Sequence, residues 1–191
     1  MSRLQPALAT LALAGGIAAA ACGDEDSVPG SGDLSSYLAL EEGASWTYRE
    51  VLDTGAVEAE DLMAARFQGD GLVALRDGAR WADGTDAGQL RWAEGHGLTL
   101  ESWRLGSESG SEPVTLVATG SGSGDSSASG GLTCIATFPT AVTSWYADFD
   151  DGMVVTCEGA GGLAGAWSFA AGFGLVRLEA AAQTLDLVAP W

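Results

Sequence analysis

Short stretches in which hydrophobic and polar residues alternate recur along the chain after residue 34, and they predict β-strands. These stretches are rich in β-branched and aromatic residues. They span residues 45–51, 98–105, 114–118, 133–138, 153–157 and 174–179. The alternation of Leu185, Asp186 and Leu187 adds a last strand, so the chain ends in a hairpin. No long stretch has the 3.6-residue period of a helix. We therefore expect a mainly β fold, with one antiparallel, curved meander sheet or an open barrel.

Tryptophans recur at a step of 11 residues. Trp81 and Trp92 lie in the related sequences RWADG and RWAEG, and Trp103 continues the step. This spacing is typical of successive strands joined by tight turns, which would place the tryptophans side by side on neighbouring strands. Packing within the sheet accounts for them, and the alternative is a platform on which a ligand stacks.

Residues 120–131 consist almost entirely of Gly and Ser. Such a segment offers little to bury and predicts a flexible loop. Only 60 residues follow it, which is small for an independent domain. We therefore expect an insertion between strands of a single domain.

The first 21 residues are organised like a secretory signal peptide. Arg3 precedes an uncharged run rich in Ala and Leu, which ends in Ala19-Ala20-Ala21 before Cys22. The segment resembles a bacterial lipoprotein signal, although Ala19 stands where Leu is usual. The resemblance implies that Cys22 is lipidated and becomes the first residue of the mature chain. The alternatives are cleavage that leaves Cys22 unmodified, and a retained anchor, for which an apolar run of about 15 residues is short.

Residues 22–34 are acidic and rich in Gly, Ser and Pro, which predicts a flexible tether before a single β domain at 35–191. The chain has 8 basic residues, all Arg, against 26 acidic ones, so its net charge is −18. The scattered arginines form no basic surface, which argues against nucleic acid as a partner. Anionic headgroups would repel this chain, so we expect the protein to attach to the membrane through the lipid on Cys22 alone. We expect a cell-envelope location, at the outer membrane, because Gly23 is not the Asp that retains enteric lipoproteins in the inner membrane.

Two further cysteines, Cys134 and Cys157, remain if Cys22 is lipidated. An oxidising compartment permits a disulfide between them. Its formation requires that the two strands be neighbours or that one cysteine sit at a strand end facing the other. We also expect residues 145–149 to form a strand joined through an acidic turn to residues 153–157. Two buried free thiols are the alternative.

The two ends of the β domain carry a further resemblance. Tyr37-Leu38-Ala39-Leu40 leads into Gly43-Ala44-Ser45-Trp46-Thr47-Tyr48, and residues 167–179 read WSFAAGFGLVRLE. These segments are similar to the G-x-x-W-x-Y start and the W-F-A-x-G-x-G-L-V-x-x-E ending of uncharacterised bacterial envelope lipoproteins. Ala171 stands where those proteins often have Pro. The resemblance implies a β-rich lipoprotein domain and brings no activity or cofactor with it.

Few residues suggest catalytic or metal chemistry. His96 is the only histidine, so a site built on several histidines is ruled out. The glycine-rich residues 159–165 predict a turn, since no βαβ unit surrounds them. Asp148, Asp150 and Asp151 are weak candidates for a cation such as Ca²⁺, and a solvated hairpin tip is the alternative.

Three classes of function remain open. The first is a non-catalytic β domain that binds a protein, glycan or lipid at the envelope, or that has a structural role. The second is a hydrolase that uses carboxylates such as Asp148, Asp150 and Asp151. The third is a carrier whose curved sheet encloses an acyl chain. We expect no enzyme activity, because no catalytic constellation is recognisable.

Overall fold

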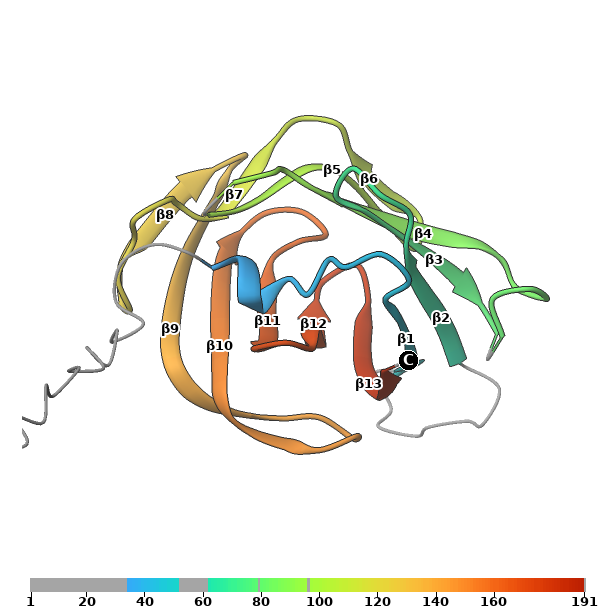
Figure 1. Cartoon of the computed structure of the whole chain (residues 1–191). Helices are drawn as coiled ribbons and strands as arrows, with labels where there is room; N and C mark the ends of the chain where they lie inside the picture. The colour runs from blue at the N-terminus through green and yellow to red at the C-terminus, as the bar shows by residue number, and fades with distance from the viewer. Residues whose placement is uncertain (1–33, 52–61, 79, 96, 191) are drawn as a thin grey trace, which may run out of the picture.

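The structure is a computed structural model that describes residues 34–51, 62–78, 80–95 and 97–190. It confirms the mainly β prediction, because 13 strands form one antiparallel sheet after a single turn of 3₁₀ helix, η1 (Ser35–Tyr37) (Figure 1). The strands are β1 (Ser45–Glu50), β2 (Leu62–Phe67), β3 (Leu72–Asp77), β4 (Thr85–Trp92), β5 (Leu98–Leu105), β6 (Glu108–Gly110), β7 (Val114–Val117), β8 (Ser126–Ser129), β9 (Leu132–Thr143), β10 (Asp148–Gly159), β11 (Gly165–Ala170), β12 (Gly174–Ala180) and β13 (Thr184–Pro190).

The strands that come first and last in the sequence, β1 and β13, pair with each other in the middle of the sheet. Trp46 of β1 lies opposite Pro190 of β13, and Glu50 lies opposite Leu185. From this pair the sheet extends as two meanders, β2 to β6 on one side and β12 back to β8 on the other. Almost every strand therefore lies beside its neighbours in sequence, as antiparallel hairpins require.

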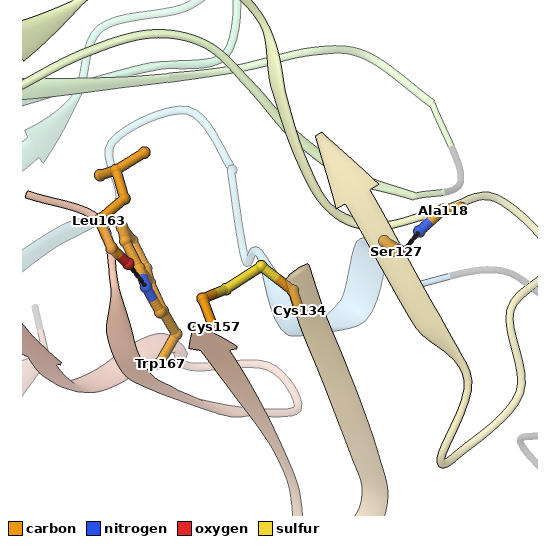
Figure 2. Close-up of a disulfide and its surroundings, with 6 residues drawn as sticks. All are labelled: Ala118, Ser127, Cys134, Cys157, Leu163 and Trp167. Atoms are coloured by element: carbon orange, nitrogen blue, oxygen red, sulfur yellow. Dashed lines mark hydrogen bonds between the residues drawn. A yellow bond between two sulfur atoms is a disulfide. The ribbon is translucent and has the colours of Figure 1, made fainter. Parts of the chain in front are cut away.

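The sheet curls until its two ends approach each other. β7 pairs with β5 and lies next to β8, where the Ala118 N–H donates to Ser127 Oγ at 2.9 Å (Figure 2). Ser129 Oγ donates to the Pro113 carbonyl at 3.4 Å. No ladder joins the described residues of β7 and β8, so the sheet stays unclosed at this seam.

The concave face of the sheet forms the core. β9 shows the clearest alternation, with buried and exposed residues following one another along most of the strand. Trp92 from β4 meets Trp167 and Phe169 from β11 edge to face, with ring centroids 6.3 and 6.0 Å apart. β4 and β11 are far apart in the strand order, so these rings join opposite walls of the curled sheet.

The prediction that the three regularly spaced tryptophans lie side by side is wrong. Trp81 lies in the turn between β3 and β4, where the guanidinium groups of Arg66 and Arg76 approach its ring at 5.4 and 4.5 Å. Trp92 and Trp103 lie on paired strands, but Trp92 is opposite Leu100 and Trp103 is opposite Leu90. Antiparallel pairing sends equivalent positions of successive strands toward opposite ends.

The Gly/Ser segment also differs from the prediction of a loop over residues 120–131. Ser126–Ser129 form β8, which pairs with β9 so that Ser127 lies opposite Cys134. Backbone hydrogen bonds and the small size of the side chains let this strand lie beside β7 at the seam. The composition of this segment does not indicate a strand, because the segment lacks the β-branched and aromatic residues that are typical of the other strands.

Candidate functional site

The disulfide between Cys134 and Cys157 is confirmed (Figure 2). The two cysteines lie directly opposite each other on β9 and β10, with their Cα atoms 4.0 Å apart. Both are buried, at 1% and 3% exposure. The bond is therefore a structural cross-link inside the core. The predicted signal peptide (residues 1–21), Cys22 and residues 23–33 of the predicted tether lie outside the described residues, whereas Leu34, the last residue of that predicted tether, is buried at 4% exposure.

The acidic residues Asp148, Asp150 and Asp151 lie within β10, so the predicted turn at this place is wrong. The predicted strand over residues 145–149 is also wrong, because the chain turns at residues 144–147. Gly152 marks a bulge in the strand, where the register with β9 shifts. A Cβ at Gly152 would come within 2.6 Å of Val142 Cγ2, so only glycine fits there.

The structure separates these acids instead of bringing them together. Asp148 accepts a hydrogen bond from Thr143 Oγ1 at 2.8 Å, and Asp151 accepts one from the Tyr37 hydroxyl at 3.1 Å. Within the part of the chain that the structure describes, no three His, Cys, Asp or Glu side chains group as metal ligands. His96 lies outside the described residues. The glycine-rich residues 159–165 form the turn between β10 and β11, as predicted.

The most distinctive surface feature is the turn of the long β9–β10 hairpin, residues 144–147, which we call the aromatic tip. Trp145 is 61% exposed and Tyr146 is 45% exposed. Ser144 fixes the turn, since its buried Oγ accepts hydrogen bonds from the N–H groups of Tyr146 and Ala147 at 3.2 and 3.3 Å. The Oγ of Ser144 also donates to the Ala147 carbonyl at 3.3 Å, and the Ser144 N–H donates to the same carbonyl at 3.0 Å.

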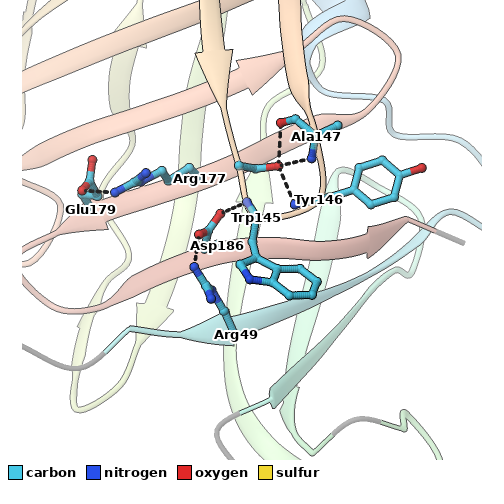
Figure 3. Close-up of polar contacts among 8 residues, drawn as sticks. Arg49, Trp145, Tyr146, Ala147, Arg177, Glu179 and Asp186 are labelled. Carbon is cyan, nitrogen blue, oxygen red and sulfur yellow. Dashed lines mark hydrogen bonds and ion pairs between the residues drawn. The ribbon is translucent and has the colours of Figure 1, made fainter. Parts of the chain in front are cut away.

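The aromatic tip docks on the convex face of β13. The Trp145 N–H donates to Asp186 Oδ1 at 2.8 Å, and the Tyr146 N–H donates to the Leu187 carbonyl at 2.9 Å. Asp186 is only 4% exposed, and its other oxygen pairs with Arg49 at 2.9 Å (Figure 3). The Arg49 guanidinium in turn lies 5.5 Å from the centroid of the Trp145 ring. The backbone of the tip is therefore held in place. The Trp145 ring is mostly exposed, and the Tyr146 ring is partly exposed beside the Phe173 ring, with the two centroids 6.3 Å apart.

A split between β12 and β13 explains why the hairpin docks there. The two strands pair only from Arg177–Asp186 to Glu179–Thr184, and beyond Arg177 they separate. Separated strands leave backbone carbonyls without their ladder partners, and buried carbonyls need other donors. The tip supplies one such donor, the N–H of Tyr146, to Leu187.

Two buried side chains of β1 supply donors to the other side of the split. Trp46 Nε1 donates to the Phe173 carbonyl, and the Tyr48 hydroxyl donates to the Leu175 carbonyl, both at 2.7 Å. Tyr48 is 3% exposed, and this burial raises its pKa well above the ordinary value for a tyrosine. The split is thus sealed from inside by side chains and from outside by the aromatic tip.

The interior of the curled sheet is filled. An apolar cavity of about 20 Å³ remains among residues that include Leu38, Trp46, Tyr48 and Trp92. This volume is close to that of a single water molecule's site, and the lining offers it almost no polar partner. In this conformation the cavity is far too small for an acyl chain.

Sequence reasoning missed the aromatic tip. The consecutive aromatics Trp145 and Tyr146 stand between two strand patterns, which was the available signal. Alternation alone does not tell which aromatic residues are covered, because coverage depends on where a distant strand lies. Comparisons with protein-family models, curated proteins and solved structures gave no significant match. In the described ranges, no helix is long and apolar enough to span a bilayer.

Proposed function

We propose that this protein is a lipid-anchored envelope lipoprotein whose β domain is a non-catalytic binding module, and that the aromatic tip contacts a protein partner. The observation that carries the proposal is the exposure of Trp145 and Tyr146 on a turn whose backbone is fixed. Exposed tryptophan and tyrosine are enriched among the residues that dominate protein–protein binding. Because the turn is already ordered by Ser144 and Asp186, little conformational entropy is lost when a partner binds.

The surroundings of the tip favour a protein over a membrane surface. Asp148 and Asp150 are exposed on the adjoining strand, and the chain carries a net charge of −18. Anionic headgroups would be repelled at this place. A partner protein that has a pocket lined by apolar groups and rimmed by basic residues would match both the aromatic rings of the tip and the negative charge beside them.

A first test addresses the lipid anchor. Cys22→Ala should move the protein from the membrane fraction to the soluble envelope fraction, because the acyl chains are the proposed source of membrane affinity. Fractionation and immunoblotting in a native host measure the change. A Cys22→Ala protein that stayed membrane-bound with its signal removed would contradict the proposal.

A second test addresses the tip. A photo-reactive amino acid at position 146 should give one discrete protein adduct in intact envelopes, and Trp145→Ala should abolish it. With the purified partner, Trp145→Ala should weaken binding about tenfold or more, as loss of a central aromatic does. Ile135, 46% exposed on β9, gives a matched control position. Equal adducts at 135 and 146, or an adduct unaffected by Trp145→Ala, would refute the tip as the contact surface.

The two alternative functions receive less support. A carboxylate-dependent hydrolase needs convergent acids, whereas Asp148 and Asp151 are engaged by different partners. A carrier needs a cavity of the size of its ligand, whereas the apolar cavity measures about 20 Å³.

A further inference from the structure

A second surface feature lies at the end of the sheet where the β5–β6 hairpin faces the β10–β11 turn. A groove of about 610 Å³ opens there, and its lining includes Trp103, Ser107, Glu108, Ser109, Glu112 and Leu163. We call it the Trp103 groove. Its volume lies in the range of small-molecule binding sites.

Glycines shape this groove. Trp103 is half-buried and lies on β5 opposite Gly110, and a Cβ at Gly110 would collide with the indole nitrogen. A Cβ at Gly162, across the groove, would lie 2.6 Å from the carboxylate of Glu108. The absence of side chains at both positions lets the indole pack against the backbone of Gly110 and the carboxylate of Glu108 pack against Gly162. Trp103 and Glu108 therefore fill this space and form walls of the groove.

The polar groups of the groove offer both donors and acceptors. Ser107, Ser109 and a third hydroxyl, Ser111, can donate or accept, and the carboxylates of Glu108 and Glu112 accept. β6 is the last strand of its meander, so one edge of its backbone has no strand partner among the described residues. The hydroxyls can accept from an ammonium ion, but the free backbone N–H groups of this edge need an acceptor, which such an ion lacks.

The charge of the groove excludes another class of ligand. Its lining contains two carboxylates and no arginine. Uncompensated carboxylates repel phosphates, sulfates and acidic sugars. What remains is a neutral ligand that has hydroxyl groups around a ring with an apolar face, which is the chemistry of a neutral saccharide. An indole ring stacks against such a face, while the hydroxyl groups bond to serines and carboxylates.

We propose that the Trp103 groove binds a neutral saccharide without cleaving it. The groove lies at the opposite end of the strands from η1, which contacts the β11–β12 turn through the Gly172 N–H and the Ser36 carbonyl at 2.8 Å. This site is separate from the aromatic tip, so each proposal can fail without the other.

The test is calorimetric titration of the full chain, in a detergent without a sugar headgroup, with chitotriose, cellotriose and maltotriose. We expect at least one of the three to bind, and Trp103→Ala and Glu112→Gln each to weaken that binding about tenfold. Trp81→Ala, in the turn between β3 and β4, is the matched control and should bind like the wild type. Circular dichroism and thermal melting verify that each variant is folded, and Glu112→Gln covers the case in which Trp103→Ala is not.

Several outcomes would overturn the proposal. One is that none of the three sugars binds at millimolar concentration. Another is that Glu112→Gln binds the sugar as tightly as the wild type, and a third is that Trp81→Ala loses as much binding as Trp103→Ala. Tighter binding of spermine that weakens with added salt would assign the groove to a cation instead. Release of shorter sugars, followed by chromatography, would show that the site is catalytic.

Discussion

At the scale of single residues, two buried tyrosines make the stability of the fold depend on pH. Burial raises the pKa of Tyr48 well above the ordinary tyrosine value of about 10, and burial, followed by the hydrogen bond and charge of Asp151, raises the pKa of Tyr37 to about 12. The folded protein therefore holds these phenolic protons more tightly than the unfolded chain does. Their contribution to stability is complete below the unfolded pKa and is lost as the pH rises through the folded one.

We predict that the free energy of unfolding falls above about pH 10, by up to about 1.4 kcal/mol per pH unit for each buried tyrosine. Urea unfolding, followed by circular dichroism at successive pH values, measures this fall. Tyr48→Phe should reduce it, and Tyr37→Phe/Tyr48→Phe should largely remove it. Each variant is compared with its own value at pH 8, because Tyr48→Phe leaves the Leu175 carbonyl unpaired at a cost of about 1–3 kcal/mol. A double variant with an undiminished alkaline fall would contradict the prediction.

Sequence reasoning succeeded for residues that have only one kind of bonding partner. Cys134 and Cys157 were the one pair available once Cys22 was assigned to the lipid, and the expected oxidising compartment favoured a disulfide over two free thiols. The exposure of Trp145 and the burial of Trp92 could not be predicted. Both are tryptophans in or beside strands, and their environments differ through contacts with β13 and β11, which are distant in sequence.

At the scale of elements, the β9–β10 hairpin carries both the disulfide and the aromatic tip. Its turn was misplaced because Asp150-Asp151-Gly152 has the composition of a turn. In the structure Gly152 instead permits a bulge, and the strand continues to Asp148. Glycine serves both purposes, and only the packing of Val142 over Gly152 distinguishes them.

The disulfide should stabilise this hairpin by restricting the unfolded chain. We predict that Cys134→Ser/Cys157→Ser lowers the free energy of unfolding by about 3 kcal/mol, as the chain-entropy model gives for a loop of this length. Urea unfolding of the oxidised protein measures the loss, and Thr156→Ser, exposed beside Cys157, is the control. Mass spectrometry without reduction should find no alkylatable thiol at either cysteine. Two free thiols or an unchanged stability would count against this role.

At the scale of the whole molecule, the segment before β1 belongs to the fold. Leu34, Tyr37 and Leu38 are 4%, 3% and 9% exposed and cover one end of the curled sheet. Burying one such side chain contributes about 1.5–3 kcal/mol, so the three together approach the total stability of a typical domain.

We therefore predict different behaviour for two shortened chains. A chain beginning at Leu34 should melt cooperatively at nearly the temperature of the longer protein, whereas one beginning at Ala44 should be largely unfolded at 37 °C. Tyr37→Ala in the longer protein should cost about 3–4 kcal/mol. Differential scanning calorimetry measures all three. Cooperative melting of the chain that begins at Ala44, at an unchanged temperature, would show that the segment is dispensable.

The fold class could be predicted from alternation and from β-branched and aromatic composition, because the period of two is clear in strands such as β9 and the second half of β10. The order of the strands was only partly accessible. Hairpins follow from sequence neighbourhood, but the pairing of β1 with β13 joins residues more than 130 positions apart, such as Arg49 and Asp186. No local pattern encodes such a pairing, since it depends on the curvature of the complete sheet.

That central pairing also bears on how the protein comes to be folded. Neither meander is complete without the other, because β1 has β13 as one of its two neighbours and the core is shared between the walls. A high contact order of this kind slows folding, and the chain cannot finish the sheet until its last strand has emerged. If the protein is exported as an unfolded chain, as the signal-like residues 1–21 predict, slow folding would keep it unfolded until transport across the membrane is complete.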